Sequence, residues 1–134
     1  MPRQVADKVW IIPNHGGDPH PAIVIRLSSD GRRALVLSGT GTGPRDIPHE
    51  VVDPERRANK ALRLNKKTYF YQSALHVRLV DELVCHETPA IRCPLALWEK
   101  LQVLALAGAR AKLSEQDLHE WWPELPATEA PSKT

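Results

Sequence analysis

The sequence of 134 residues predicts one mainly β domain that carries an amphipathic helix near its C-terminal end. Two apolar runs, residues 22–27 and 34–37, flank the pair Asp30-Gly31. This is the strongest short-range signal for a β-hairpin, because glycine tolerates the positive φ that such a turn requires. Further on, apolar residues between positions 95 and 107 recur at a spacing of three and four, which indicates one apolar helix face.

The predicted hairpin is apolar on both sides of each strand. Residues 23–25 and 36–37 are too continuously apolar for a sheet with one face in water. We therefore expect the hairpin at the centre of the sheet or within a closed barrel. Residues 9–12 form a short apolar run stopped by Pro13 and predict a first strand.

Five further segments are candidate strands. Residues 46–52 alternate weakly, and the aromatic run 69–71 has high β propensity. Residues 75–79 alternate apolar and polar side chains with period two, as in a half-buried strand. The short apolar pairs 83–84 and 90–91 are expected to close a small sheet.

The C-terminal part of the chain is expected to be helical and then disordered. Pro94 suits the first position of the amphipathic helix, and Gly108 either ends this helix or weakens it. Ser114 is the expected N-cap of a second, short helix. We therefore expect one domain over residues 1–113, followed by an acidic helix and a disordered tail over residues 114–134.

Composition restricts the possible environments. The formal net charge of +2 is too small to bind nucleic acid through the overall field. Two cysteines give no disulfide framework. No apolar run approaches the ~20 residues of a membrane helix, and the first ten residues lack the apolar segment of a secretory signal. A cytoplasmic protein without membrane contact is expected.

Charge is unevenly distributed along the chain. Residues 56–80 contain seven basic residues and no acidic one, whereas residues from 114 onward are mostly acidic. An anionic partner for the basic stretch, docking of the acidic tail onto it, and two separately solvated faces all agree with this pattern.

A glycine-rich segment, residues 39–43, follows the second hairpin strand. It lacks the Gly-Lys-Ser/Thr ending of a P-loop, and no helical pattern follows it, so a nucleoside triphosphate site is not expected. Backbone N–H groups of such a turn can hold a single phosphate. A flexible hairpin loop is the structural alternative.

His20 is the first candidate for acid–base chemistry, because the ordinary pKa of histidine lies near neutral pH. Pro19 and Pro21 hold its neighbours extended, although a solvated surface histidine has the same signature. Cys85 and Cys93 lack the short spacing of a zinc knuckle. No metal or other cofactor is expected.

Basic and aromatic residues adjoin in the middle of the chain. Arg63, Lys66 and Lys67 precede Tyr69 and Tyr71. Proteins that bind single-stranded RNA use this mixture, stacking bases on rings and pairing phosphates with cations. The alternative is that the rings belong to the core and the cations are solvated.

A pair of tryptophans, Trp121 and Trp122, follows the predicted acidic helix. Exposed, they would anchor a partner protein. Folded back, they would cover the sheet. The sequence leaves both possibilities open.

The order of these pieces resembles that of the PemK/MazF-like toxins of bacterial toxin–antitoxin systems. The resemblance covers residues 8–106, and its most telling parts are Pro-Ala-Ile-Val-Ile after His20 and the segment Leu-Asn-Lys-Lys-Thr-Tyr-Phe over residues 64–70. It implies an SH3-like barrel with a C-terminal helix. It also implies a homodimeric, sequence-selective endoribonuclease that needs no metal and has a cognate antitoxin.

The resemblance also implies which residues act. In that family a basic residue, usually Arg, precedes the strand proline and pairs with a Thr or Ser at the end of the next long strand. Here these positions are His20 and Thr40, with Ser38 and Thr42 as alternatives in register. Arg45 would stabilise the phosphorane, since His20 is a poorer permanent cation than Arg.

The leading hypothesis is therefore an endoribonuclease toxin that cleaves single-stranded RNA without metal. His20 would be the acid–base group, Thr40 a hydroxyl contact and Arg45 the partner of the phosphorane. Phosphates and bases of the RNA would be held by the residues already named, Arg63, Lys66, Lys67, Tyr69 and Tyr71. The alternative is a catalytically inactive SH3-like barrel that binds nucleic acid or protein, and a weaker one is an adaptor acting through Trp121 and Trp122.

Overall fold

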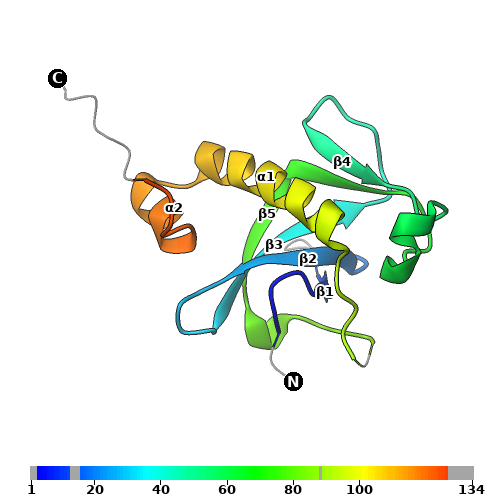
Figure 1. The fold of residues 1–134 in the computed structure, drawn as a ribbon, viewed down its shortest axis with the longest axis horizontal. Helices are drawn as coiled ribbons and strands as arrows, with labels where there is room; N and C mark the ends of the chain where they lie inside the picture. Colours follow the sequence, from blue (N-terminus) through cyan, green and yellow to red (C-terminus); the bar gives the residue numbers. More distant parts are fainter. Residues whose placement is uncertain (1–2, 13–15, 88, 127–134) are drawn as a thin grey trace.

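The computed structural model describes residues 3–12, 16–87 and 89–126, and within them the chain is mainly β (Figure 1). Five strands form an antiparallel sheet in the order β1-β2-β3-β5-β4. A helix of 18 residues, α1, lies across one face of this sheet (Figure 1). The elements are β1 (Lys8–Ile11), β2 (His20–Leu27), β3 (Arg33–Thr40), β4 (His49–Val52), η1 (Arg57–Leu62), β5 (Thr68–Leu79), η2 (Val80–Glu82), α1 (Leu95–Lys112) and α2 (Glu115–Trp121).

The predicted hairpin is confirmed and lies inside the sheet. Gly31 has a φ of +72°, and the Asp30 carboxylate accepts hydrogen bonds from the Ser28 hydroxyl and the Arg32 backbone N–H. β3 pairs with β2 on one edge and with β5 on the other. It is therefore the central strand, as the apolar run over residues 34–37 predicts.

The two faces of the hairpin enter two different hydrophobic clusters. Ile23 and Leu35 pack in the cluster that α1 covers, whereas Val24 and Val36 pack in a second cluster with Val9 of β1. Successive side chains of a strand point to opposite faces. Burial on both faces is why these strands read as continuous apolar runs instead of alternating ones.

The middle of the chain differs from the expected arrangement. The aromatic run 69–71 and the alternating run 75–79 belong to one strand, β5, instead of two. The pairs 83–84 and 90–91 contribute no full strand, but isolated bridges join Trp10 to Val84 and Asp7 to Arg92. These bridges hold the segment after η2 against β1.

A buried lysine joins three segments behind the sheet. Lys8 is 1% exposed, and its ammonium donates to the Leu62 carbonyl at 2.6 Å and lies 3.4 Å from the Glu87 carboxylate. Burying an ammonium is unfavourable unless it is paired and hydrogen-bonded, and both partners are present here. Through these two contacts the Lys8 ammonium connects β1 with η1 and with the loop after η2.

Helix α1 continues through Gly108, so this glycine does not end the helix. A Cβ atom added at Gly108 would lie 2.3 Å from the backbone oxygen of Gln72 in β5. The Lys112 ammonium donates to the Ser73 carbonyl at 2.6 Å. Glycine is required at this position because the helix backbone and the strand backbone are in direct contact.

The C-terminal segment folds back onto the sheet. The Ser114 hydroxyl accepts from the Asp117 N–H at 3.1 Å, which confirms the predicted N-cap of α2. Trp121 and Trp122 are 4% and 3% exposed and share the core cluster with α1. The tryptophans therefore cover the core and are not an exposed anchor, which removes the basis of the adaptor hypothesis. Most of the predicted disordered tail, residues 127–134, lies outside the described residues.

The acidic segment docks on the central hairpin and not on the basic stretch 56–80. Glu120 pairs with Arg33 at 3.1 Å, and Glu124 pairs with Arg26. The Arg33 and Arg26 guanidinium groups also lie over the rings of Trp121 and Trp122, at 5.4 Å and 5.2 Å from their centroids. Of the arrangements that the charge pattern allowed, tail docking occurs, but its partner is the hairpin.

Within the described residues, no helix is both long enough and apolar enough to cross a membrane.

The contact between α1 and β5 predicts whether Gly108→Ala raises or lowers the free energy of unfolding. Helix propensity alone would make Gly108→Ala stabilising by about 1 kcal/mol. Because the added methyl meets the Gln72 carbonyl, we expect destabilisation by about 1–3 kcal/mol instead. Urea unfolding of both proteins measures this difference. Ala107→Gly, at an exposed neighbouring position, calibrates propensity and should cost about 0.5–1 kcal/mol. A stabilised Gly108→Ala protein would contradict the close contact.

Candidate functional site

The β3–β5 ladder breaks near the end of β3. Leu37 pairs with Leu75, but Gly39, two positions further along β3, pairs with Phe70, five positions back along β5. Residues 71–74 therefore lie opposite Ser38 alone, and this part of β5 bows away from β3. The Gln72 N–H donates to the Pro48 carbonyl at 2.8 Å, outside the ladder. The bowed segment leaves a hollow between β3, β5 and the loop that precedes β4.

We call this hollow the groove, and its volume is about 370 Å³. The start of β2, the end of β3, the middle of β5 and the loop before β4 all contribute to its walls. The side chains in its lining that can donate, accept or transfer protons include His20, Ser38, Thr40, Arg45, Tyr71 and His76.

The three predicted catalytic residues all line the groove. His20 is the first residue of β2 and pairs with Ile11 of β1, whereas Thr40 is the last residue of β3. Arg45 follows in the loop, with its guanidinium 5.8 Å from the centroid of the Tyr71 ring. Segments distant in sequence thus bring an imidazole, a hydroxyl and a guanidinium to one hollow.

Ser38 and Thr42, the two alternatives to Thr40, lie in different positions relative to the groove. Ser38 also lines the groove. Thr42, by contrast, is not among the described residues that line it, and its backbone N–H donates to the Thr40 hydroxyl at 3.2 Å. Of the three candidate hydroxyls, Thr40 and Ser38 therefore line the groove, and Thr42 does not.

The glycines at the end of β3 are explained by close packing. A Cβ at Gly39 would lie 2.4 Å from the Thr68 methyl, and one at Gly41 would lie 2.5 Å from Cε of Lys66. Neither glycine has the positive φ that an anion-binding turn of successive N–H groups uses. Strand β5 and the residues that precede it pack directly against this glycine segment. The segment is therefore neither an open phosphate-binding turn nor an unconstrained loop.

The predicted RNA-binding tyrosines form one aromatic cluster beside the groove. The rings of Tyr69 and Tyr71 are nearly parallel, at an interplanar angle of 13°, with centroids 6.2 Å apart. The His49 ring lies 5.2 Å from that of Tyr71. Tyr71 is 4% exposed and donates its hydroxyl proton to the Thr42 carbonyl at 3.0 Å. Tyr71 forms part of the groove wall, and the half-buried Tyr69 lies next to it.

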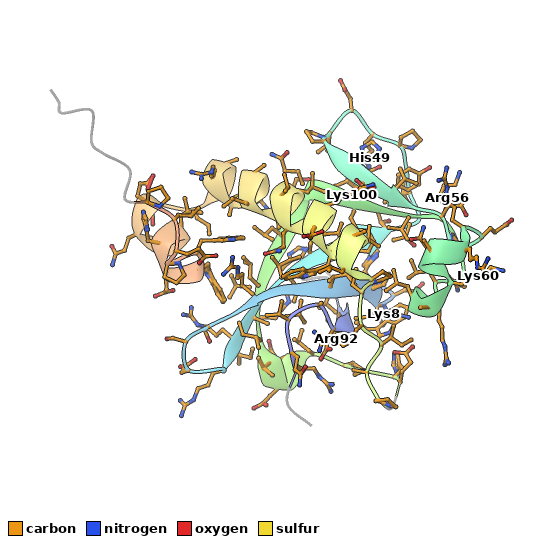
Figure 2. The ribbon with its side chains drawn as sticks, in the orientation of Figure 1. Lys8, His49, Arg56, Lys60, Arg92 and Lys100 are labelled. Carbon is orange, nitrogen blue, oxygen red and sulfur yellow. The ribbon has the colours of Figure 1, made fainter. Side chains whose placement is uncertain are left out.

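The predicted phosphate contacts are not gathered in the groove. Lys66 extends over the glycine segment beside it, but Lys67 lines a separate cleft of about 480 Å³ together with Arg56. Arg63 lines a third hollow. Arg56 directly precedes η1 and Lys60 lies within it, at the opposite end of the molecule from α2 (Figure 2). The basic stretch therefore spreads over several surfaces.

His76 is the groove residue that the sequence did not single out. Its Nε2 lies 3.3 Å from the Ser38 hydroxyl oxygen. The pKa of His76 is lowered from 6.5 to about 4, first by burial and then by the charges of Arg78, Lys112 and His20. In the sequence it is one of six histidines, in a strand that alternates. Only the register of β5 against β3 places it beside Ser38.

No side-chain cluster in residues 3–12, 16–87 and 89–126 has three or more His, Cys, Asp or Glu groups able to hold a metal ion. Both cysteines are free thiols, and burial raises the pKa of Cys93 to about 12.

A scan of the chain against protein-family models finds no matching family, and a search of curated proteins finds no similar protein.

The lowered pKa of His76 predicts how stability depends on pH. Between about pH 6.5 and about pH 4 the unfolded chain protonates this imidazole and the folded chain does not. The unfolded state then binds more protons, so the free energy of unfolding should fall as pH is lowered through this window. His76→Gln should lose less stability than the wild type between about pH 7 and about pH 5. Urea unfolding at both pH values measures this, and equal losses in the two proteins would contradict a depressed pKa.

Proposed function

We propose that this chain is a metal-independent endoribonuclease that cleaves single-stranded RNA by phosphodiester transfer through the 2′-hydroxyl. The observation that carries the proposal is the groove, in which His20, Thr40 and Arg45 meet from separate elements. This set contains an imidazole, a neutral hydrogen-bonding group and a permanent cation. An imidazole can transfer the protons that cleavage through the 2′-hydroxyl moves, and the other two groups can stabilise the phosphorane.

The reaction forms one bond and breaks one at the same phosphorus. The 2′-oxygen attacks the adjacent phosphate, and the bond to the 5′-oxygen of the next nucleotide breaks. The products are a 2′,3′-cyclic phosphate and a 5′-hydroxyl. His20 transfers protons, and the Arg45 guanidinium stabilises the negative charge of the phosphorane, to which the Thr40 hydroxyl donates. The attacking group comes from the RNA, so DNA is not a substrate.

The aromatic cluster supports RNA as the ligand of the groove. Unpaired bases stack on aromatic rings, whereas bases inside a duplex are already stacked. The half-buried rings of Tyr69 and His49 lie beside the catalytic groups, backed by the buried Tyr71, and Lys66 offers a cation against the glycine segment. In this proposal Arg63 and Lys67 act only on RNA that extends past the groove, because they line other hollows.

The proposal includes the family suggested by the resemblance. The antiparallel sheet, the bridges from β1 to the segment after η2, and the helix α1 support an SH3-like barrel of the PemK/MazF type. A homodimer, a cognate antitoxin and a cytoplasmic location follow from this part of the proposal.

A direct assay tests the activity. Purified protein should cleave single-stranded RNA in EDTA and leave 2′,3′-cyclic phosphate ends, detected by gel electrophoresis and end analysis. His20→Ala should lower the cleavage rate by about 10²–10⁴-fold, as expected on removing a proton-transfer group. His119→Ala, an equivalent change on α2 away from the groove, should retain the rate. If the wild type leaves RNA intact, or if His20→Ala cleaves as fast, His20 is not the catalyst.

The second candidate is a module that binds RNA in the same groove without cleaving it. Two observations favour it. Arg45 is exposed and lies over the Tyr71 ring. His20 occupies the position at which the PemK/MazF-like toxins, which the sequence resembles, usually have Arg. Expression in bacteria separates the two functions: an active toxin should arrest growth, and a binding module should not. RNA binding by the wild type without cleavage or growth arrest would decide for the module.

A further inference from the structure

The groove holds two imidazoles, and the proposed function uses only one of them. His20 enters from the start of β2 and His76 from the middle of β5. The two rings are close enough for the charge of His20 to act on the protonation of His76. Cleavage through the 2′-hydroxyl needs one group that takes a proton and another that gives one. Two histidines on different walls of one groove are suited to divide these tasks.

Ser38 contacts one of the two ring nitrogens of His76. The Ser38 hydroxyl lies 3.5 Å from the Ala74 carbonyl oxygen, and His76 Nε2 lies 3.3 Å from the same hydroxyl oxygen. With the hydroxyl proton directed to Ala74, the hydroxyl oxygen accepts from Nε2–H of His76. In that tautomer Nδ1 has a lone pair that can accept a proton, and our proposal uses this tautomer.

Burial disfavours a positive charge on His76, and the charges of Arg78, Lys112 and His20 add to this effect. Arg78 lies on the same strand, Lys112 is on α1, and His20 enters from β2. Arg45 lines the same groove from the loop before β4. A neutral imidazole keeps a lone pair that can take a proton, as a general base must.

We propose that His76 is the general base that takes the 2′-hydroxyl proton, with Ser38 positioning its ring, and that His20 is the general acid that protonates the leaving 5′-oxygen. The proton from the 2′-hydroxyl moves to His76 Nδ1 as the 2′-oxygen–phosphorus bond forms. A proton from His20 moves to the 5′-oxygen as its bond to phosphorus breaks, so charge and atoms balance. This assignment rests on the proposed function and adds the direction of each proton transfer.

A substrate with sulfur in place of the bridging 5′-oxygen separates acid from base, because a thiolate leaves without protonation. The cleavage site is first mapped on a mixed-sequence single-stranded RNA, and the sulfur is then placed at that site. On normal RNA, His20→Ala and His76→Gln should each be slower than wild type by about 10²-fold or more. On the sulfur substrate, His20→Ala should recover toward the wild-type rate, whereas His76→Gln should stay impaired.

Matched variants complete the design. His119→Gln makes the same substitution outside the groove and should cleave both substrates normally. Ser38→Ala keeps the imidazole but removes its partner, so it should slow both substrates less than His76→Gln and change the acid limb of the pH–rate profile. Thermal unfolding, and binding of a strand with a 2′-deoxy group at the cleavage site, show that each variant folds and holds its ligand.

The outcomes separate the two proposals. If the wild type cleaves neither substrate, the proposed function is wrong, and the base assignment is wrong with it. If the wild type cleaves and folded His76→Gln cleaves normal RNA equally well, only the assignment of His76 is overturned. If the sulfur substrate rescues His76→Gln instead of His20→Ala, His76 is the acid and the proposed direction is reversed.

Discussion

The break in the β3–β5 ladder is the constraint on which the groove depends. Next to the break, Val36, Leu37 and Ser38 of β3 stay in register with Val24, Ile23 and Ala22 of β2, so the extra residues there lie in β5. In a bowed strand some backbone N–H and C=O groups have no partner in the ladder, and they need other hydrogen-bond partners. The Pro48 carbonyl accepts from Gln72 N–H, and the Lys112 ammonium donates to the Ser73 carbonyl. The bow is thus held from both sides, and these contacts shape the groove.

Helix α1 has a direct part in this arrangement. Gly108 brings its backbone against the Gln72 carbonyl, at the position where β5 leaves β3. A side chain at that position would push the helix away from the bowed segment, and the reach of Lys112 to Ser73 would be lost as well. The helix that the sequence predicts from its apolar face therefore also supports the wall of the groove.

Local patterns predicted the elements that local interactions specify. The Asp30-Gly31 turn, the amphipathic helix and the Ser114 cap each depend on neighbouring residues, and each is confirmed. The ladder break depends on pairing between distant strands, so β5 read as two strands. For the same reason the role of His76 was not visible. Its distance from Ser38 follows from the register of β5 against β3, which no spacing within either strand encodes.

The docked C-terminal segment has a consequence for spectroscopy. Trp121 and Trp122 lie beneath Arg33 and Arg26, against the hairpin, whereas the rings beside the groove are Tyr69, Tyr71 and His49. Indole emission shifts to longer wavelength when the ring meets water, and phenol emission does not respond in this way. Two of the four tryptophans, Trp121 and Trp122, therefore report on the attachment of α2 at the hairpin, and substitution of Trp10 and Trp98 would isolate their emission from the rest of the chain.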